Sequence, residues 1–412
     1  MELPVGGTRR PQGPLRIAYV SADRGQPVFG RSRVAARAQA FLRTLRAQGH
    51  AVEVFAPRPG QDRPLGLADL PVHALPAGRA GRRWPPVWRA LAVNGDLRAA
   101  LETAGPFDLV YERYSLWSYA AMDWAAGAMI PSILEVDAPL VELEGRRLGV
   151  LEAHAGVRVA HRAFGAAGVL AAASPAVADY LQTLRIPAER VRPAPHAIEP
   201  ERFLPEPGPA WSAPPGSFTI GYAGPLGDAE ALPVLLRAFA SLARFHEDCQ
   251  LLVVGDGPER ERLETQLGEW GLADRAWFAG AVPPCEVPSW LAAMDAVVTP
   301  PSVAADWGWP LEVYEAMASG RAVVARQSGR GRSLVEHELT GFTVPADDAW
   351  ALATALSRLR RDYELRRRLG ANARAVVVRQ HSWAARARAL LGLAQVGTVP
   401  RVPLPAGRGW PQ

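Results

Sequence analysis

Two glutamates, Glu312 and Glu315, stand on a predicted helix that leads into an apolar strand, within DWGWPLEVYEAMASGRAVVA (residues 306–325). A helix that opens at the end of a buried strand can bind phosphate groups, because its first N–H groups and its dipole face the ligand. Pro310 suits the first turn, where no backbone donor is lost. The preceding loop has no Lys, Arg or glycine-rich turn. The stretch is therefore either a nucleotide site that lacks its usual cations or a packed corner.

Short apolar segments recur along the chain and alternate with segments rich in Ala, Leu and Arg that suit helices. This alternation is typical of α/β proteins with a parallel, doubly wound sheet, which bind ligands at the carboxyl ends of their strands. The predicted strands are residues 16–21, 51–57, 108–114, 132–137, 168–174 and 190–198, followed by 218–224, 250–257, 276–280, 296–300, 321–326 and 341–345.

A length of 412 residues exceeds what one core usually holds, so we expect two domains. The densest Pro/Gly stretch predicts a linker at residues 203–217. One Rossmann-like domain then covers residues 14–202 and a second covers residues 218–377, and we expect them to face each other across a cleft. Residues 378–395 are expected to form a helix that crosses back to the first domain, and residues 396–412 a flexible tail.

Composition argues against several classes of protein. The net charge is only +5, and the 46 basic residues, all of them Arg, are scattered among 41 acidic residues, so we expect no nucleic-acid partner. Cys249 and Cys285 have neither the density of a disulfide framework nor the spacing of a zinc site. No apolar run approaches the length of a membrane span, and the N-terminus lacks a signal sequence. We therefore expect a cytoplasmic protein.

Six stretches, taken together in their order and spacing, resemble the family 4 (group 1) glycosyltransferases of the GT-B fold. The resemblance extends over about residues 16–392. Its acceptor-domain part resembles one subgroup, which has an ERYS-type stretch. The stretches are VVGDGPERERLE (253–264), FAGAVPPCEVPSWLAAMDAVVTP (278–300), LEVYEAMASGRAVVA (311–325), YERYSLWS (111–118), LEVDAPLVELE (134–144) and PHAIEPERF (195–203).

The resemblance implies a retaining, hexosyl-type glycosyltransferase that needs neither a metal ion nor a cofactor. The expected partners are a nucleotide-diphosphate sugar, bound to the C-terminal domain, and an unidentified acceptor that is a glycan, a lipid-linked sugar or a small molecule. A helix N-terminus would face the diphosphate. That arrangement suits a leaving group that gains negative charge during the reaction.

The resemblance also assigns donor-binding residues in the second domain. Glu315 matches a glutamate that holds the ribose hydroxyl groups, although a solvated position on the helix surface is the alternative. A carboxylate can accept hydrogen bonds from both hydroxyls of a cis-diol. The remaining donor-binding positions on the matching loops and helix start are Gly224, Val282, Pro310 and Leu311.

The chain departs from the family at three charged positions of the donor site. Trp307 stands where the family has the first glutamate of its pair, and Pro225 and Glu230 stand where it has an Arg and a Lys. A charge-assisted hydrogen bond contributes roughly 1.5–3 kcal/mol, so these losses predict weaker donor binding by several kcal/mol.

Residues of the first domain could supply what the donor loop lacks. In the family the loop after the first strand approaches the diphosphate, and here it contains Gly30, Arg31 and Arg33. We assign Gly30 and Arg31 to donor binding and Arg33 to catalysis, with solvated arginines as the alternative. Asp137 occupies the place of a catalytic-site residue and is assigned to catalysis, although it also suits the N-cap of a helix.

Two further pairs of residues have simpler interpretations. Glu112 and Arg113, adjacent at a strand end, are expected to form a structural ion pair. Trp84 and Trp88 are interleaved with arginines, which predicts either a packed connector or a peripheral membrane contact.

Two functions from different classes thus remain open. The first is a glycosyltransferase with a modified donor site. The second is a non-catalytic, glycosyltransferase-like subunit that has lost its phosphate-binding cations and binds a partner or a glycan. A third hypothesis, a sugar-nucleotide epimerase of the same fold, receives no support from the residues of the ERYS-type stretch.

Overall fold

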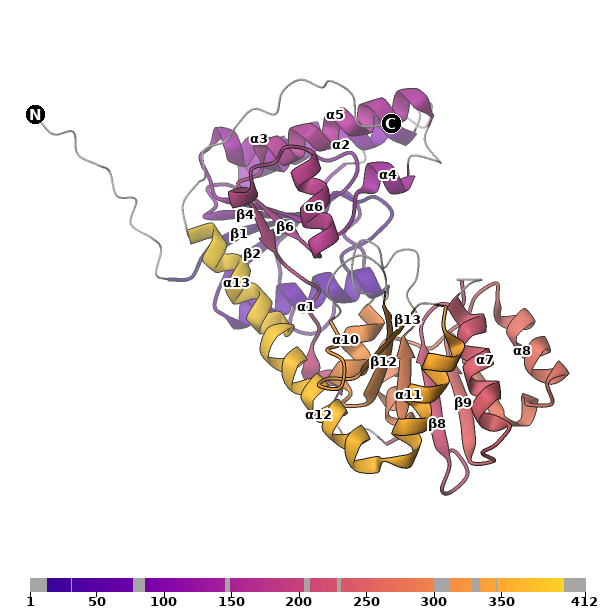
Figure 1. The fold of residues 1–412 in the computed structure, drawn as a ribbon. Coiled ribbons are helices and arrows are strands. Elements are labelled where there is room, and N and C mark those ends of the chain that lie inside the picture. Colours follow the sequence, from indigo (N-terminus) through magenta and orange to yellow (C-terminus); the bar gives the residue numbers. More distant parts are fainter. Residues whose placement is uncertain are drawn as a thin grey trace, which may run out of the picture. The chain divides into compact units, whose positions relative to one another are not determined.

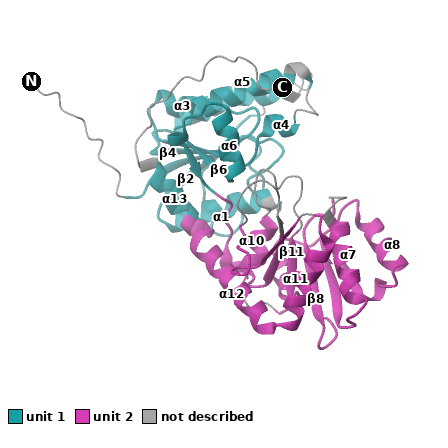
Figure 2. Ribbon diagram, viewed as in Figure 1, with its two compact units in different colours: residues 1–194, 386–412 teal, residues 195–385 magenta. Residues whose placement is uncertain are grey.

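The computed structural model describes residues 13–30, 32–76, 86–144, 149–203, 208–227, 231–299, 311–327, 334–345 and 347–395 (Figure 1). The chain divides into two compact units (Figure 2). Unit 1 comprises residues 1–194 and 386–412, and unit 2 comprises residues 195–385.

The described residues of unit 1 form a seven-stranded parallel sheet in the order β3-β2-β1-β4-β5-β6-β7. The strands are β1 Arg16–Val20, β2 Ala51–Ala56, β3 Val72–Ala74, β4 Leu109–Arg113, β5 Ser132–Val136, β6 Val169–Ala172 and β7 Val191–Pro193. The helices are α1 Arg33–Ala47, α2 Pro86–Ala104, α3 Ala120–Gly127, α4 Leu140–Glu144, α5 Val150–Ala166, α6 Pro175–Thr183 and α13 Trp383–Gln395. The first three residues of α13 belong to unit 2, and the rest of the helix, from Arg386, belongs to unit 1.

The described residues of unit 2 form a six-stranded parallel sheet in the order β10-β9-β8-β11-β12-β13. The strands are β8 Phe218–Ala223, β9 Cys249–Val254, β10 Ala276–Gly280, β11 Ala296–Thr299, β12 Ala322–Gln327 and β13 Phe342–Pro345. The helices are α7 Ala231–Ala243, α8 Arg260–Glu269, α9 Val287–Ala292, α10 Leu311–Ala318, α11 Ala349–Arg361 and α12 Tyr363–Gln380.

Both faces of the unit 2 sheet are buried, which explains why its strands read as continuous apolar runs. Alternate residues of β9 enter different cores. Leu251 and Val253 pack in a core with α7, α8 and α11, whereas Leu252 and Val254 pack in a second core with α9, α10 and α12. The predicted two-domain α/β fold with parallel sheets is thus confirmed. Strand β3 was not predicted, because its three residues lack an apolar run.

Helix starts follow from short polar side chains in the sequence. Ser32 caps α1 by accepting a hydrogen bond from the backbone N–H of Ala35 at 3.1 Å. Ser174 caps α6 in the same way, with Pro175 in the first turn. Such caps satisfy backbone donors that have no partner within the helix.

The predicted linker at residues 203–217 differs from the division that the structure shows. The chain passes from unit 1 to unit 2 between residues 194 and 195, so the Pro/Gly stretch lies within unit 2. Phe203 belongs to a core of unit 2, Trp211 packs against that core, and the N–H of Ala210 donates to the carbonyl of Ser289 at 3.0 Å. Proline restricts the backbone but does not by itself separate domains.

Two glycines set the packing of α12. A Cβ atom at Gly370 would lie 1.9 Å from the carbonyl oxygen of Gly320, in the turn after α10. We therefore expect Gly370→Ala to lower the free energy of unfolding by about 1–3 kcal/mol, because backbone must shift to admit the methyl group. Urea unfolding followed by circular dichroism measures the change.

Gly268, inside α8, is the matched control. A Cβ atom there meets no atom within 4 Å. Gly268→Ala should stabilise the protein by about 0.5–1 kcal/mol through helix propensity alone. Equal effects of the two substitutions would contradict the close approach.

Candidate functional site

Four of the predicted donor-site residues lie at the carboxyl end of the unit 2 sheet or in the elements beside it. Leu311 opens α10, and Glu315 follows one turn later. Glu315 is only 9% exposed, so it is not the solvated surface residue that was the alternative to a ligand role. Val282 follows β10, and both Val282 and Leu311 pack against the core beneath α10. Pro310 and Trp307 lie outside the described residues.

Gly224 sits where the loops after two strands meet. Its N–H donates to the carbonyl of Val254 at 2.9 Å, at the end of β9. A Cβ atom at Gly255 would lie 1.8 Å from the carbonyl oxygen of Gly224, and one at Gly224 would lie 3.5 Å from Cγ of Glu312. Glycine at position 255 therefore lets the β8 and β9 loops approach each other, and Gly224 lies beside the first turn of α10.

The loop after Gly224 carries no cation at the place where the family has one. Pro225 is exposed there, and its carbonyl accepts a hydrogen bond from the hydroxyl of Tyr222 at 2.8 Å. The next residue, Leu226, is buried. Glu230 lies outside the described residues.

In unit 1, Asp137 lies one residue beyond β5 and is held by arginines. One carboxylate oxygen accepts from Nε of Arg113 at 2.7 Å, and the other lies 3.4 Å from a terminal nitrogen of Arg37 on α1. Two nearby cations favour the ionised form of a carboxyl group. Asp137 is thus part of an ion-pair network, whether or not it also contacts a substrate.

The same network contains Glu135, which is buried in β5. Its carboxylate accepts hydrogen bonds from the guanidinium of Arg386 on α13 and the hydroxyl of Tyr111 on β4, and it pairs with Arg37 at 3.2 Å. Burial and the charge of Glu135 raise the pKa of Tyr111 well above its ordinary value, so Tyr111 stays a donor. The Tyr111 ring stacks on Tyr19 of β1 with the centroids 5.6 Å apart.

The other predicted residues of unit 1 are described in part. The carbonyl of Gly30 accepts a hydrogen bond from the side-chain amide of Gln39 at 3.0 Å, which ties the loop to α1. Arg33 begins α1, but its side chain lies outside the described residues, as does all of Arg31.

The expected ion pair between Glu112 and Arg113 does not form. Consecutive strand residues point to opposite faces of a sheet, so Arg113 meets Asp137 while Glu112 points the other way. Glu112 is completely buried, and its carboxyl group accepts a hydrogen bond from the hydroxyl of Ser118. Burial raises the pKa of Glu112 to about 7, against the effect of that hydrogen bond.

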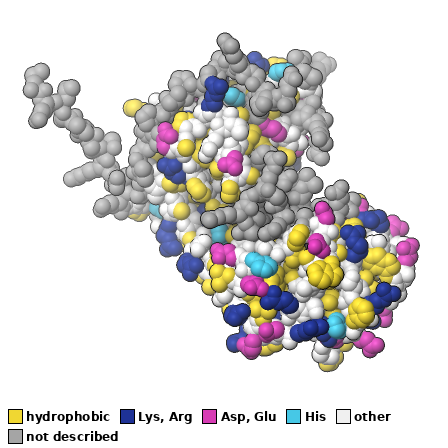
Figure 3. All heavy atoms as spheres, in the orientation of Figure 1, with side chains coloured by type: hydrophobic (Ala, Val, Ile, Leu, Met, Phe, Trp, Pro, Cys, Tyr) yellow, Lys and Arg dark blue, Asp and Glu magenta, His cyan; other side chains and the backbone are white. Residues whose placement is uncertain are grey.

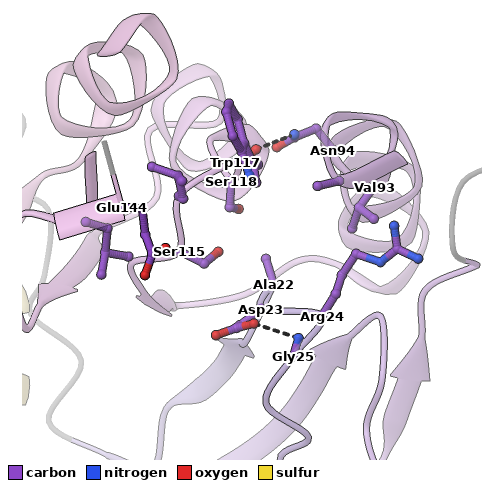
Figure 4. A pocket seen from close by; sticks show the side chains of 13 residues that line it. Ala22, Asp23, Arg24, Gly25, Val93, Asn94, Ser115, Trp117, Ser118 and Glu144 are labelled. Atoms are coloured by element: carbon purple, nitrogen blue, oxygen red, sulfur yellow. Dashed lines mark hydrogen bonds between the residues drawn. The ribbon is translucent and has the colours of Figure 1, made fainter. Parts of the chain in front are cut away.

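A pocket of about 390 Å³ opens beside Ser118, within unit 1 (Figure 4). Its volume lies in the range of small-molecule sites. We call it the unit 1 pocket; it is lined by residues 22–25 after β1, Ala90, Val93 and Asn94 of α2, residues 115–118 after β4, and Leu140 and Glu144 of α4.

Sequence reasoning did not assign this pocket, although the ERYS-type stretch runs through it. Ser115 and Ser118 could not be recognised from the sequence, because a serine by itself does not indicate a binding site. Only the fold shows that these two serines line a cavity. Carboxyl ends of neighbouring parallel strands meet at one edge, which is why the loops after β1 and β4 form one wall.

The surface gives no further assignment. On the face shown in Figure 3, basic and acidic side chains of the described residues are interspersed. Trp88 on α2 is 57% exposed, whereas Trp84 lies outside the described residues, so the membrane contact stays a prediction. Among the helices that the structure describes, none is both long and apolar enough to cross a membrane.

Comparisons with known families match each unit separately. Residues 34–197 match the family described as "Glycosyl transferase 4-like domain", and residues 217–362 match "Glycosyl transferases group 1". The two matches and the two parallel sheets define the class: the chain belongs to the glycosyltransferases of the GT-B fold.

Individual relatives cover the chain to different extents. The chain is 32% identical over 172 residues to an alpha-D-kanosaminyltransferase of Streptomyces kanamyceticus, a match that covers 42% of this chain and 44% of the relative. The chain thus spans less than half the length of this curated relative.

Solved structures match nearly the whole fold. Sucrose-phosphate synthase of Thermosynechococcus elongatus superposes with a TM-score of 0.67 at 22% identity, over 92% of this chain and 98% of that one. HepE of Anabaena, in complex with UDP and glucose, superposes with a TM-score of 0.62 at 18% identity, again over 92% and 98%.

The buried pair between Arg386 and Glu135 gives a prediction about stability. Removing one partner leaves an incompletely compensated buried charge, so Arg386→Leu should cost about 3–5 kcal/mol in free energy of unfolding. Replacing both residues with Leu should recover part of that loss. Arg388→Leu, at an exposed position on the same helix, should change stability by less than about 0.5 kcal/mol. Chemical denaturation of the wild type, the two single variants and the double variant measures these changes. Equal losses of stability in Arg386→Leu and Arg388→Leu would argue against a contribution from the buried pair.

The raised pKa of Glu112 predicts how stability depends on pH. The folded protein holds the Glu112 proton more tightly than the unfolded chain, in which the pKa is near its ordinary value of 4.5. The resulting stabilisation is complete below that value and disappears as pH rises through about 7. The wild type should therefore lose on the order of 3 kcal/mol over this range relative to Glu112→Gln. Urea midpoints measured across this range test it, with Glu269→Gln as an exposed control; parallel curves for wild type and Glu112→Gln would refute the assignment.

Proposed function

We propose that this chain is a retaining glycosyltransferase that moves a sugar from a nucleotide-diphosphate donor to a hydroxyl-bearing acceptor without a metal ion. The observation that carries the proposal is the placement of Glu315. This carboxyl group is buried on α10, one turn after the helix start, in the unit whose sequence matches group 1 glycosyltransferases. The position and residue type suit a clamp for the ribose hydroxyls of the donor.

Backbone groups take over part of the phosphate binding in this proposal. The glycines of the β8 and β9 loops lie beside the start of α10, and the first N–H groups of that helix, rather than side-chain cations, are offered to an anion. The N–H groups of Gly224 and Gly255 already donate to the carbonyls of Val254 and Gly280. The UDP and glucose bound to HepE support a nucleotide sugar as the class of donor. Arg31, and Arg33 as the catalytic cation, are the proposed sources of the missing positive charge.

Asp137 has a specific role in this scheme. Its ion pairs with Arg113 and Arg37 fix the orientation of the carboxylate. A fixed carboxylate can hold a hydroxyl group of the transferred sugar or stabilise positive charge that develops at the anomeric carbon. The unit 1 pocket is the proposed site of the acceptor, because serine hydroxyls and the Trp117 ring suit the polar and apolar faces of a sugar.

A non-catalytic subunit is the second candidate, and one observation favours it. The exposed Pro225 shows that the donor loop offers no side-chain cation at that place. A thermal-shift screen of nucleotide diphosphates and sugar nucleotides separates the two candidates, since a ligand that binds the folded state raises its melting temperature. A protein that neither binds nor turns over any sugar nucleotide would be the non-catalytic subunit.

The proposed ribose clamp gives the quantitative test. Glu315→Gln keeps the shape of the side chain but removes its charge, so affinity for UDP, or for whichever nucleotide the screen identifies, should fall by about tenfold or more. Calorimetric titration measures the affinity, and a UDP-release assay measures transfer, which should fall with it. Glu269→Gln, exposed at the end of α8, should bind like the wild type. A well-folded Glu315→Gln protein with wild-type affinity would remove the clamp from the proposal.

A further inference from the structure

The proposed reaction leaves Glu112 without a role, although its burial is costly. The side chain is 0% exposed. One carboxyl oxygen accepts a hydrogen bond from Ser118, and the other is buried with no hydrogen-bond partner among the described residues. No arginine among those residues pairs with it, in contrast to Glu135. A buried carboxyl group that lacks a cation destabilises the fold, so a benefit elsewhere is expected.

Ser118 connects this carboxyl group to the unit 1 pocket. Its side chain lines the pocket while remaining 4% exposed, and its N–H donates to the carbonyl of Ser115 at 3.1 Å. The hydroxyl proton of Ser118 is used in the bond to Glu112. The serine oxygen therefore presents lone pairs, and no proton, to a ligand in the pocket. Glu112 fixes the direction of that hydrogen bond.

Asn94, beside Ser118 in Figure 4, is different because its hydrogen-bonding capacity is already used. Its amide nitrogen donates to the carbonyls of Leu91 and Trp117, and its oxygen accepts from the N–H groups of Tyr119 and Ala120. An Asn side chain has two donors and two acceptor positions. Asn94 therefore holds the wall in place, and the recognition of a ligand falls to the serines and to the loop after β1.

The groups that remain suit a neutral polyol or sugar. Ser118 accepts a hydrogen bond, the acidic side chains of Asp23 and Glu144 and the basic side chain of Arg24 also line the pocket, and Trp117 with Leu140 gives an apolar surface. Figure 4 shows Ser115 and Ser118 on the side of the pocket that faces Ala22 and Asp23. A polyol can donate its hydroxyl protons to the polar groups, and its C–H faces can pack against Trp117 and Leu140.

We propose that Ser118 accepts a hydrogen bond from a hydroxyl group of the acceptor substrate and that Glu112 is the positioning residue that orients Ser118 for this contact. The inference rests on the proposed function, because it names residues that recognise the acceptor. It adds that the acceptor presents a hydroxyl donor at the floor of the unit 1 pocket. Glu112 itself does not touch the substrate.

Three variants separate positioning from structure. Ser118→Ala removes the acceptor atom, Glu112→Ala removes the group that orients it, and Glu112→Gln keeps a side-chain oxygen that can still accept from Ser118. Each protein and the wild type are titrated with myo-inositol, glucose and mannose by ligand-observed NMR. UDP is titrated separately by calorimetry, and circular dichroism checks folding.

Affinity for at least one of the three polyols should fall by about three- to tenfold in Ser118→Ala and Glu112→Ala. Glu112→Gln should stay within about twofold of the wild type, a rescue that a general packing defect would not produce. Affinity for UDP should be unchanged in all three variants, since neither Ser118 nor Glu112 belongs to the proposed donor site.

The outcomes for the two proposals are distinct. Wild-type polyol affinity in Ser118→Ala, no polyol binding by the wild type, or equal losses in Glu112→Gln and Glu112→Ala would each overturn the role of Ser118 and Glu112. If Glu112→Ala does not fold, Ser118→Ala and Glu112→Gln still decide. Polyol binding that falls in Ser118→Ala, in a protein that binds no nucleotide, would support this inference and refute the proposed donor.

Discussion

The parallel pairing of every strand that the structure describes is the constraint on which the rest of the molecule depends. Parallel strands need a crossover between them, so helices cover both faces of each sheet and the strands become buried on both sides. The carboxyl ends then meet along one edge. In unit 1 this edge brings together the loops after β1 and β4 and the residue after β5; in unit 2 it brings together the loops after β8 and β9 and the start of α10.

Because the strands are buried on both faces, a charged side chain in a strand loses its hydration, which costs free energy. The neighbouring strands β4 and β5 compensate a buried carboxyl group in different ways. Glu135 in β5 is compensated by two arginines, Arg37 and Arg386, and by a hydrogen bond from Tyr111. Glu112 in β4 has only a serine, so burial favours the neutral acid. The first solution fixes the position of a helix in the fold. The second leaves a buried carboxyl group whose hydrogen-bond partner, Ser118, lines the unit 1 pocket.

Sequence reasoning predicted the two sheets well because strands buried on both faces are long apolar runs that stand out from their helices. It missed β3, which is too short and too polar to do so. It also placed the domain boundary in the Pro/Gly stretch at residues 203–217, where Trp211 and Phe203 instead anchor the chain to unit 2. The candidate site is a different matter, because residue types and spacing do not show which side chains the fold brings together. Motif spacing proposed Glu315 and Gly224, whose roles in donor binding stay predictions. The pairing of Glu112 with Arg113 was wrong, because consecutive side chains of a strand point to opposite faces of the sheet.

Pro225 stands where the family has an arginine, and this difference changes how unit 2 could bind an anion. Side-chain cations bind phosphate through long-range charge, which salt screens, whereas N–H groups at a helix start act only within the first turn. On the proposed function, an anion site at the start of α10 therefore depends on shape, because the close contact between the Gly255 and Gly224 backbones sets the position of the loops beside that helix start. On the proposed function, affinity that is not supplied by charge has to come from the ribose and the base, and the buried Glu315 is the proposed ligand of the ribose. On the proposed function, the loss of charge at the phosphates makes the clamp on the ribose more important.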